Sequence, residues 1–294
     1  FPVGTTLDYD QTQVLKVYNK HDVTATKDFY FETLPMIEFR RELSIKTGKD
    51  FTNFNDTKIG KQTMQMYLEK AGVQCYDYGL NGRQPRQTKR PRINLADAVF
   101  PWLTFIEPEF TRIAEWFKAQ TITETKGVFK GLTAHVGGLD FVFGTGGLHA
   151  SVDSRQFVAD EEYVILDVDV AAMYPSIAIA HKLYPEHLGE KFVDIYAGIR
   201  DQRAKHKKGT PENAMLKLAL NGVYGDSNSK FSIFYDPMFT MKITINGQLM
   251  LCLLAEKLMR IESLTMIQAN TDGLTMHVKR AQLDRVRMIC RWWE

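Results

Sequence analysis

Two runs of strand-forming residues, each ending in a carboxylate, constrain the fold of this chain most. The first covers residues 163–170, which are rich in β-branched side chains and long enough for a central strand. Alternate residues of a strand share one face, so Asp167 and Asp169 should project to the same side. Asp169, at the strand end, is a candidate for chemistry.

The second run starts at residues 265–269 and returns, after a turn at 270–273, as a strand over 274–278. The turn sequence Asn-Thr-Asp-Gly is typical of a hairpin and puts Asp272 at its tip. Antiparallel strands, combined with the helices predicted below, indicate an α+β fold.

The segment between these runs predicts a helical hairpin. Residues 200–208 form one helix with a basic face, which Gly209 should stop. Thr210 then supplies the N-cap and Pro211 the first position of a second helix. The basic face of the first helix consists of Arg200, Arg203 and Lys207. The second helix places Lys217, Asn221 and Tyr224 on one face and ends at Gly225.

The rest of the chain supplies further elements. Helices are predicted up to about Lys46, over residues 61–71 and, as a long helix, over residues 247–260. Glycine-punctuated runs between residues 127 and 147 predict two or three hairpin strands. A turn at Tyr-Pro-Ser 174–176 should precede an apolar helix. Residues 79–93 read as a polar, basic loop, either a solvated insertion or a phosphate contact.

Composition sets the broad class. At 294 residues the chain can form two or three lobes, and no stretch approaches the roughly 20 apolar residues that span a membrane. The start has no signal-peptide pattern, and three separated cysteines without a Cys-x-x-Cys pair fit a reduced, cytosolic protein in which they are inert. The first residue is not Met, and no turn or tail follows Trp293, so we expect a piece of something longer.

Charge is distributed unevenly on a chain whose net charge is only +2. Residues 200–217 contain six basic and two acidic residues, and residues 83–92 contain five basic residues and no acid. Local basic patches on a near-neutral protein fit the binding of a polyanion at chosen places.

These groups together suit nucleotidyl transfer. Carboxylates of Asp169 and Asp272, with the backbone carbonyl of Val170, offer the oxygen ligands that hard divalent cations prefer. Two such ions about 3.5–4 Å apart activate a nucleophile and neutralise a leaving group. Lys217 and the basic face can hold the leaving phosphates.

Several motifs match a known family. Residues 169–176 (Asp-Val-Ala-Ala-Met-Tyr-Pro-Ser), 217–225 (Lys-Leu-Ala-Leu-Asn-Gly-Val-Tyr-Gly) and 270–273 resemble motifs A, B and C of family-B DNA polymerases, particularly the bacteriophage type. Residues 18–22 resemble the third motif of the proofreading exonuclease, and residues 144–149 resemble a linker motif that contacts template. The resemblance covers nearly the whole chain, although residues 45–125 contribute mainly order and spacing.

The resemblance implies roles residue by residue. Asp169 and Asp272 would be catalytic metal ligands for two Mg²⁺ ions, with Mn²⁺ as a substitute, and Lys217 would hold the triphosphate. Tyr174 of motif A would exclude a 2′-hydroxyl, and motif B would line the nascent base pair. The implied nucleotide-binding residues are Tyr174, Arg203, Lys207, Asn221, Tyr224 and Gly225.

Other positions have lesser roles under the same resemblance. Tyr18 and Asp22 would belong to the exonuclease site, and Gly146 and Gly147 would contact DNA. Asp167 has no family role and should make a structural hydrogen bond. His149, in the linker motif, should likewise make a local hydrogen bond.

The chain departs from the family pattern at motif C. The family usually begins this motif with Asp and ends it with Ser, whereas this chain has Asn270 and Gly273. The first two exonuclease motifs would lie before Phe1 and the thumb after Glu294, so proofreading by this chain alone is not expected. The gaps between motifs hold no room for the insertions of protein-primed members, so an ordinary nucleic-acid primer is expected.

The implied architecture is an antiparallel palm with helical-hairpin fingers, preceded by the end of an exonuclease domain and a β-rich connecting region, with the thumb absent. The boundaries are 1–125 for the exonuclease part and connecting helices, 126–160 for the linker region, 161–195 for palm with motif A, 196–228 for fingers and 229–294 for palm with motif C. Primer–template DNA and deoxynucleoside triphosphates are the expected partners of a monomer in the cytoplasm of a bacterial host.

Two alternatives stay open. A catalytically silent remnant that only holds primer–template DNA is favoured by Asn270 and the missing thumb, and disfavoured by the intact Asp169, Lys217 and Asp272. A standalone nuclease is disfavoured by the absence of the early acidic motifs.

Overall fold

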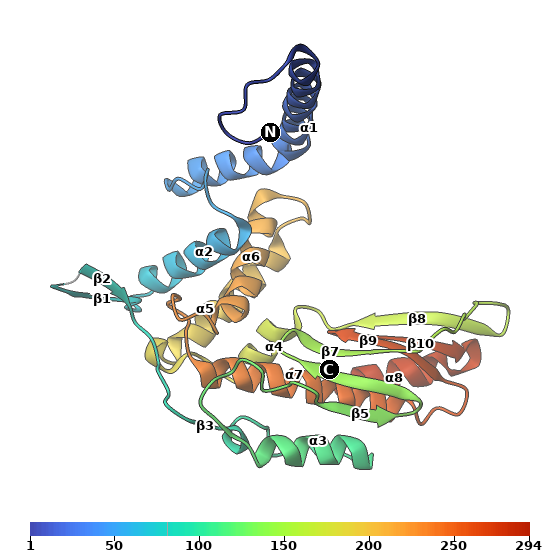
Figure 1. Cartoon of the computed structure of the whole chain (residues 1–294). Coiled ribbons are helices and arrows are strands. Elements are labelled where there is room, and N and C mark those ends of the chain that lie inside the picture. Colours follow the sequence, from blue (N-terminus) through green and yellow to red (C-terminus); the bar gives the residue numbers. More distant parts are fainter. Residues whose placement is uncertain (81) are drawn as a thin grey trace.

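The computed structural model describes residues 1–80 and 82–294, and a six-stranded antiparallel sheet is its largest β element (Figure 1). The strand order is β5-β6-β7-β9-β10-β8. The strands are β5 (Thr133–Val136), β6 (Leu139–Gly144), β7 (Gly147–Ser151), β8 (Tyr163–Asp169), β9 (Thr265–Thr271) and β10 (Gly273–Lys279). Two small ribbons pair β1 (Tyr76–Gly79) with β2 (Gly82–Pro85) and β3 (Ile93–Asn94) with β4 (Thr121–Ile122).

Eight α-helices and three 3₁₀ turns are described besides the strands. They are α1 (Tyr9–Thr47), α2 (Asp56–Lys70), α3 (Pro108–Lys118), α4 (Met173–Ala180), α5 (Lys191–Lys205), α6 (Pro211–Asp226), α7 (Pro237–Leu258) and α8 (Leu283–Trp293), with 3₁₀ turns η1 (Leu95–Asp97), η2 (Glu186–Leu188) and η3 (Arg280–Gln282). The mixture of helices and antiparallel strands confirms the predicted α+β class.

The sheet has one buried and one exposed face. Alternation along β6 buries Leu139, Phe141 and Phe143, while the residues between them face outward. Helices α3 and α7 pack on the buried side, where the apolar side chains of β10 also lie. The opposite face carries polar side chains, including both acidic residues of β8.

Strand β8 is an edge strand, not the central strand predicted from its composition, because β10 is its one partner among the described strands. Its side chains alternate between half-buried and exposed, so one face meets solvent and carries Asp167 and Asp169. Strand β7 pairs with β9, so strands from the predicted linker range and the predicted palm ranges lie in one sheet. The predicted domain boundaries remain predictions.

Helix α7 runs through the core and starts ten residues earlier than predicted. Asp236 caps it by accepting a hydrogen bond from Met238 N, and Pro237 occupies its first position. Contrary to the expectation from the sequence, α7 is long and apolar enough to cross a membrane, but 78% of its most apolar stretch is buried inside the protein. Its buried polar side chains, described below, reach several distant segments.

Two boundaries differ from the sequence-based expectation for physical reasons. Helix α5 ends at Lys205, since Asn213 donates hydrogen bonds to the carbonyls of Arg203 and His206 and so caps the helix. Lys207 therefore lies in the connecting turn and does not extend the basic helical face. The predicted turn at 174–176 is the first turn of α4, where Pro175 is tolerated because no N–H is needed there.

The predicted basic loop at 79–93, of which residue 81 lies outside the described residues, contains the end of β1 and strand β2, and three of its four arginines, Arg83, Arg86 and Arg90, are paired within the protein. The Arg83 guanidinium lies 3.4 Å from the Tyr76 ring centroid, and Arg90 contacts Asp236 at 3.0 Å. These pairings favour a structural role over phosphate contact.

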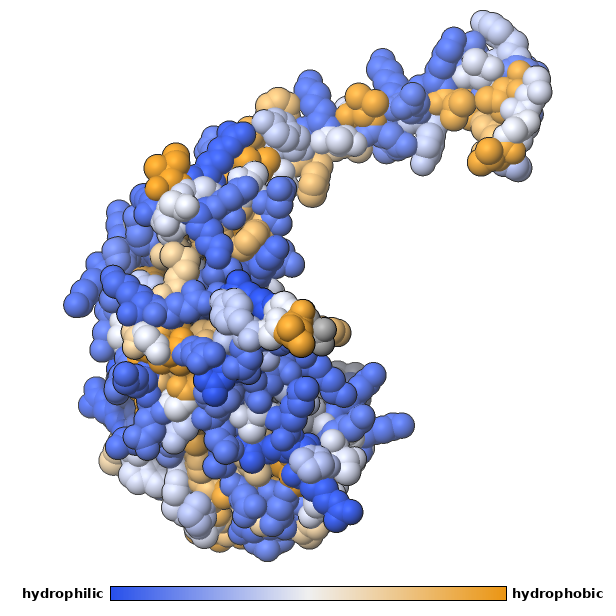
Figure 2. All heavy atoms as spheres, turned by 90° about the vertical axis from the view of Figure 1, so that its left-hand side faces the viewer, coloured by the Kyte–Doolittle hydropathy of each residue, from blue (hydrophilic) through white to orange (hydrophobic). Residues whose placement is uncertain are grey.

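Helix α2 packs tightly across α6, while α1 projects as an arm. At the crossing, a Cβ on Gly60 would lie 2.1 Å from the carbonyl oxygen of Leu218. Figure 2 shows the arm leaving the body, with apolar side chains interspersed among polar ones along it. Leu43 is the buried residue of this helix and joins Phe51 and Ile59 in a small cluster against α6.

This crossing generates a stability prediction. Gly60→Ala must push the two helices apart, so we expect a loss of about 1–3 kcal/mol in the free energy of unfolding, as for overpacked cores. Gly198→Ala, in α5 where a Cβ meets nothing within 4 Å, is the matched control and should be neutral or stabilising by up to about 1 kcal/mol. Urea denaturation of both variants measures this, and equal stabilities would contradict the close crossing.

Candidate active site

The two predicted carboxylates meet at neighbouring strand ends. Asp169 closes β8, and Asp272 lies in the turn between β9 and β10, whose backbone is joined to β8 by a 2.8 Å hydrogen bond from Val170 N to Asp272 O. Partial burial, and after it the negative charge of Asp169, raises the pKa of the Asp272 carboxyl. No cation of residues 1–80 or 82–294 pairs with either carboxylate, so the repulsion between them is left uncompensated within the described protein.

Gly273 provides the room in which the Asp169 carboxylate lies. Strand pairing places His149, Asn270, Gly273 and Asp169 in one row across β7, β9, β10 and β8. All of them but Gly273, which is buried, are exposed. A Cβ at position 273 would lie 2.1 Å from Asp169 Oδ1. The absence of a side chain there is therefore required by the observed position of the carboxylate.

Tyr174, from the segment that resembles motif A, packs against Tyr224, from the segment that resembles motif B. The rings of Tyr174 and Tyr224 stack with centroids 4.0 Å apart, and the Tyr174 hydroxyl donates a hydrogen bond of 3.1 Å to the carbonyl of Gly146. Burial raises the pKa of the Tyr174 hydroxyl, so it stays protonated as a donor. The Tyr174 side chain thus joins the turn at residues 144–147, α4 and α6.

Helix α7 contacts α6, the turn at residues 144–147 and α4 through Thr244, Gln248 and Gly247, which lie on one face of the helix. Thr244 Oγ1 hydrogen bonds the Tyr224 hydroxyl at 2.8 Å, and Gln248 Oε1 accepts a 3.0 Å hydrogen bond from Gly144 N. Gly247 lies against α4, where a Cβ would be 2.8 Å from the terminal methyl of Met173. Sequence reasoning missed these residues. Polar and glycine residues at helical spacing inside an apolar run were the signal that could have found them.

Lys207, Lys217 and Asn221 of the helical hairpin are exposed, and Arg203 is half-buried. Lys217 and Asn221 lie on the exposed stripe of α6, and Lys217, Arg203 and Lys207 form no ion pair with the described residues. By contrast, Lys61 pairs with Asp226 at 2.9 Å, and Lys46 pairs with Glu212. The hairpin therefore leaves the predicted anion-binding cations uncompensated.

Some predicted residues lie elsewhere or behave differently. Tyr18, 63% exposed, and Asp22 lie one turn apart on the α1 arm, away from the strand ends (Figure 1). Asp167 accepts a 2.6 Å hydrogen bond from Thr275, which confirms its expected structural role. The local hydrogen bond expected of His149 is not formed with any described residue, because its imidazole faces solvent on the open face of the sheet.

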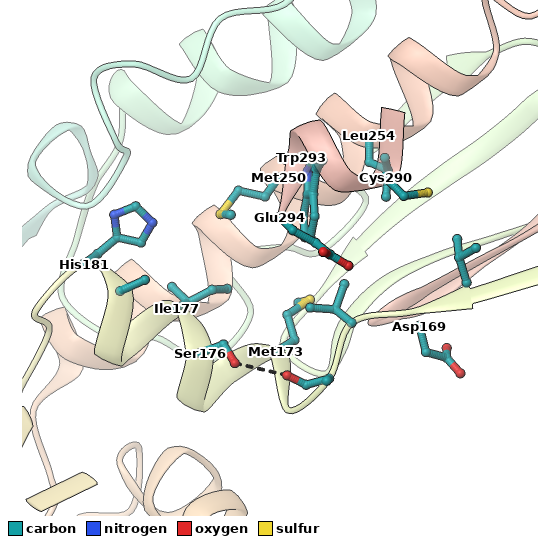
Figure 3. A pocket seen from close by; sticks show the side chains of 14 residues that line it. Asp169, Met173, Ser176, Ile177, His181, Met250, Leu254, Cys290, Trp293 and Glu294 are labelled. Carbon is teal, nitrogen blue, oxygen red and sulfur yellow. Dashed lines mark hydrogen bonds between the residues drawn. The ribbon is translucent and has the colours of Figure 1, made fainter. Parts of the chain in front are cut away.

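A cavity of about 360 Å³ lies on the other side of Asp169. It is lined mostly by apolar side chains of α4, α7 and α8, including Met173, Met250 and Trp293. Figure 3 shows the Asp169 carboxylate pointing away from this cavity, toward the opposite side of its strand. Asp169 therefore lines this cavity while its carboxylate points out of it (Figure 3).

The donor set at the strand ends fits a hard cation but is small. Asp169 and Asp272 supply carboxylate oxygens, and the Val170 carbonyl is available as a further oxygen ligand. Within the described residues, no group of three or more His, Cys, Asp or Glu side chains gathers at one place. Partial burial and, after it, the charge of Asp169 raise the pKa of the Asp272 carboxyl, and a bound cation would offset both effects.

Comparison with known proteins finds a likeness in structure but none in sequence. No protein-family model and no curated protein matches the sequence. A solved structure, the family B DNA polymerase from the hyperthermophilic archaeon Pyrobaculum calidifontis, is similar to 95% of this chain at a TM-score of 0.44 and 14% sequence identity. This chain covers 33% of that chain, so it spans about a third of its length. A likeness this loose assigns no residue and no activity.

The uncompensated carboxylate pair predicts a pH-dependent effect on stability. Because folding raises the pKa of Asp272, the protein in metal-free buffer loses stability as pH rises through that raised value. Asp272→Asn removes the charge, so the variant should melt at a higher temperature than the parent near neutral pH, and the difference should vanish at acidic pH. Thermal denaturation in chelator measures this.

The matched control is Asp167→Asn, on the same face of β8, which loses a hydrogen bond and should not gain stability. A melting temperature of Asp272→Asn at or below that of the parent near neutral pH would contradict the destabilisation of the Asp272 carboxylate by burial and by Asp169.

Proposed function

We propose that this chain is the palm and fingers of a DNA-directed DNA polymerase of the bacteriophage family-B type, with the end of an exonuclease domain before it. The observation that carries the proposal is that distant segments of the chain meet at one place. Asp169, Asp272 and the stacked Tyr174 and Tyr224 come from three distant segments, and the Gly146 carbonyl from a fourth, yet they lie around one set of strand ends. These segments are the ones that resemble the polymerase motifs.

The proposed reaction is the attack of a primer 3′-oxygen on the α-phosphate of a deoxynucleoside triphosphate. Asp169, Asp272 and the Val170 carbonyl would hold two Mg²⁺ ions, or Mn²⁺ in their place, and such ions lower the pKa of the nucleophile and neutralise the departing pyrophosphate. Lys217 would contact the triphosphate, with Arg203 and Lys207 near it on the hairpin. The lack of protein partners for these cations supports the assignment.

The stacked tyrosines would select the sugar and support the base pair. Tyr174 is held on one side by Tyr224 and by its hydroxyl on Gly146, so its ring cannot swing away easily. A fixed ring beside the sugar would exclude a 2′-hydroxyl by steric contact. Asn221 and Gly225 on the exposed stripe of α6 would face the nascent pair, and Gly146 and Gly147 would approach the DNA backbone.

The expected setting follows from the same proposal. Substrates are primer–template DNA and deoxynucleotides in the cytoplasm of a bacterial host, and the chain is proposed to act as a monomer. Tyr18 and Asp22 are proposed to complete a proofreading site only together with residues outside this chain.

A binding-only remnant is the second candidate, and one observation favours it. Asn270 stands in the cross-strand row where the family usually has a third acid, so only Asp169 and Asp272 bring negative charge to the described strand ends. Metal-dependent extension separates the two candidates.

Asp169→Asn and Asp272→Asn should each abolish templated extension of a labelled primer, by at least about 10³-fold, because each removes a charged metal ligand. Binding of primer–template DNA should change little. Asp167→Asn is the control, since it lies on the same strand face but is hydrogen-bonded to Thr275. Extension by either active-site variant would contradict the polymerase proposal, and binding without extension by the parent would favour the remnant.

Tyr174→Val should admit ribonucleotides more readily by removing the ring that excludes the 2′-hydroxyl. The measurement is the ratio of deoxynucleotide to ribonucleotide incorporation in single-turnover extension, which should fall by at least about tenfold, the equivalent of 1.4 kcal/mol. Tyr174→Phe, which keeps the ring but loses the hydrogen bond to Gly146, should retain most of the discrimination. An unchanged ratio in Tyr174→Val would contradict the exclusion of the 2′-hydroxyl by the Tyr174 ring.

A further inference from the structure

The loop between α6 and α7, residues 227–236, presents an aromatic side chain that the proposed mechanism does not use. Phe231 is 88% exposed, more than any other phenylalanine in the described part of the chain, where Phe29 follows at 70%. The next three residues, including Ile233 and Phe234, are fully buried. The chain therefore turns one aromatic ring outward from a segment that is otherwise packed into the core.

The exposure of this ring does not come from a loose loop. Gln87 Nε2 donates hydrogen bonds to the carbonyls of Lys230 at 2.9 Å and Ser232 at 2.8 Å, on either side of Phe231. Lys61 Nζ on α2 donates to the carbonyl of Phe231 itself at 3.5 Å. Segments more than 140 residues away in sequence thus fix the backbone around the ring. A ring on a fixed backbone is preorganised for contact.

Position and charge indicate what the ring contacts. The loop leaves the end of α6 that carries Tyr224, two residues before the helix ends, and the exposed stripe of α6 runs toward it. Lys230, next to Phe231, is exposed and forms no ion pair with any residue in the described ranges. An unpaired nucleic-acid strand that runs from the site along α6 would meet a cation and then an aromatic face.

We propose that Phe231 is a stacking platform for the first unpaired base of the template strand, with Lys230 contacting an adjacent phosphate. The inference rests on the proposed polymerase function and names the residue that receives template ahead of the site. An aromatic face accepts every base, because each base has a π face. The lysine adds a phosphate contact that carries no sequence information.

The test measures the dissociation constant of a fluorescently labelled primer–template with a short unpaired template overhang, by anisotropy at fixed salt in chelator. Phe231→Ala should weaken binding at least about fivefold, the equivalent of about 1 kcal/mol for one stacked base. Phe231→Trp should keep the affinity. Phe29→Ala on the α1 arm is the matched control for loss of an exposed phenylalanine and should have no effect.

A second DNA separates stacking from other effects of the substitution. With an abasic site at the first unpaired template position, the parent should lose the same factor as Phe231→Ala loses on intact template. Phe231→Ala should lose nothing more on the abasic DNA, because ring and base act as one pair. Additive losses, or unchanged binding by Phe231→Ala, would overturn the proposal.

The two proposals fail in different ways. Primer extension by the parent together with additive losses overturns the platform and leaves the polymerase function standing. Coupled losses without extension under any metal condition overturn the polymerase function and leave single-strand stacking standing. Absence of binding by the parent to every DNA tested overturns both.

Discussion

The polar face of helix α7 is the constraint on which the rest of this structure depends. Thr244, Gly247 and Gln248 fall at helical spacing in a buried helix, and each reaches a different part of the candidate site. Asn246 and Glu256 on the same helix accept hydrogen bonds from Phe100 N and Ile106 N, which fixes the segment before α3. Because a buried polar group without a partner costs free energy, each of these contacts also specifies where its partner segment must lie.

This arrangement explains how catalytic candidates from distant segments stay in register. Strand pairing alone sets the distance between Asp169 and Asp272, since Asp169 pairs with Gly273 of β10 and Asp272 lies in the turn directly before it. Strand pairing also places the turn at residues 144–147, because β7 pairs with β9, but it does not set the position of Tyr174. That position depends on α7, which contacts α4, β7 and β10 at once. A rigid helix in the core thus converts three local motifs into one site.

The sequence predicted the local chemistry better than the packing. The hairpin tip at Asp272, the capped restart at Thr210 and the strand into Asp169 follow from short-range rules, and the structure confirms all three. The edge position of β8 and the end of α5 at Lys205 were not predictable in this way. They depend on which strand pairs with β10 and on the side chain of Asn213, and both are contacts between residues far apart or in different elements.

The close crossing of α2 and α6 has a mechanical consequence. Gly60 brings the two helices so near that neither can slide along the other, and Lys61 ties the same turn of α2 to Asp226 at the end of α6. The α1 arm is attached to this pair through the small cluster around Leu43 and Phe51. Any rotation of α6 about its base must therefore carry α2 with it as one rigid body. A small angular displacement at the base then becomes a wide sweep at the far end of a helix 39 residues long.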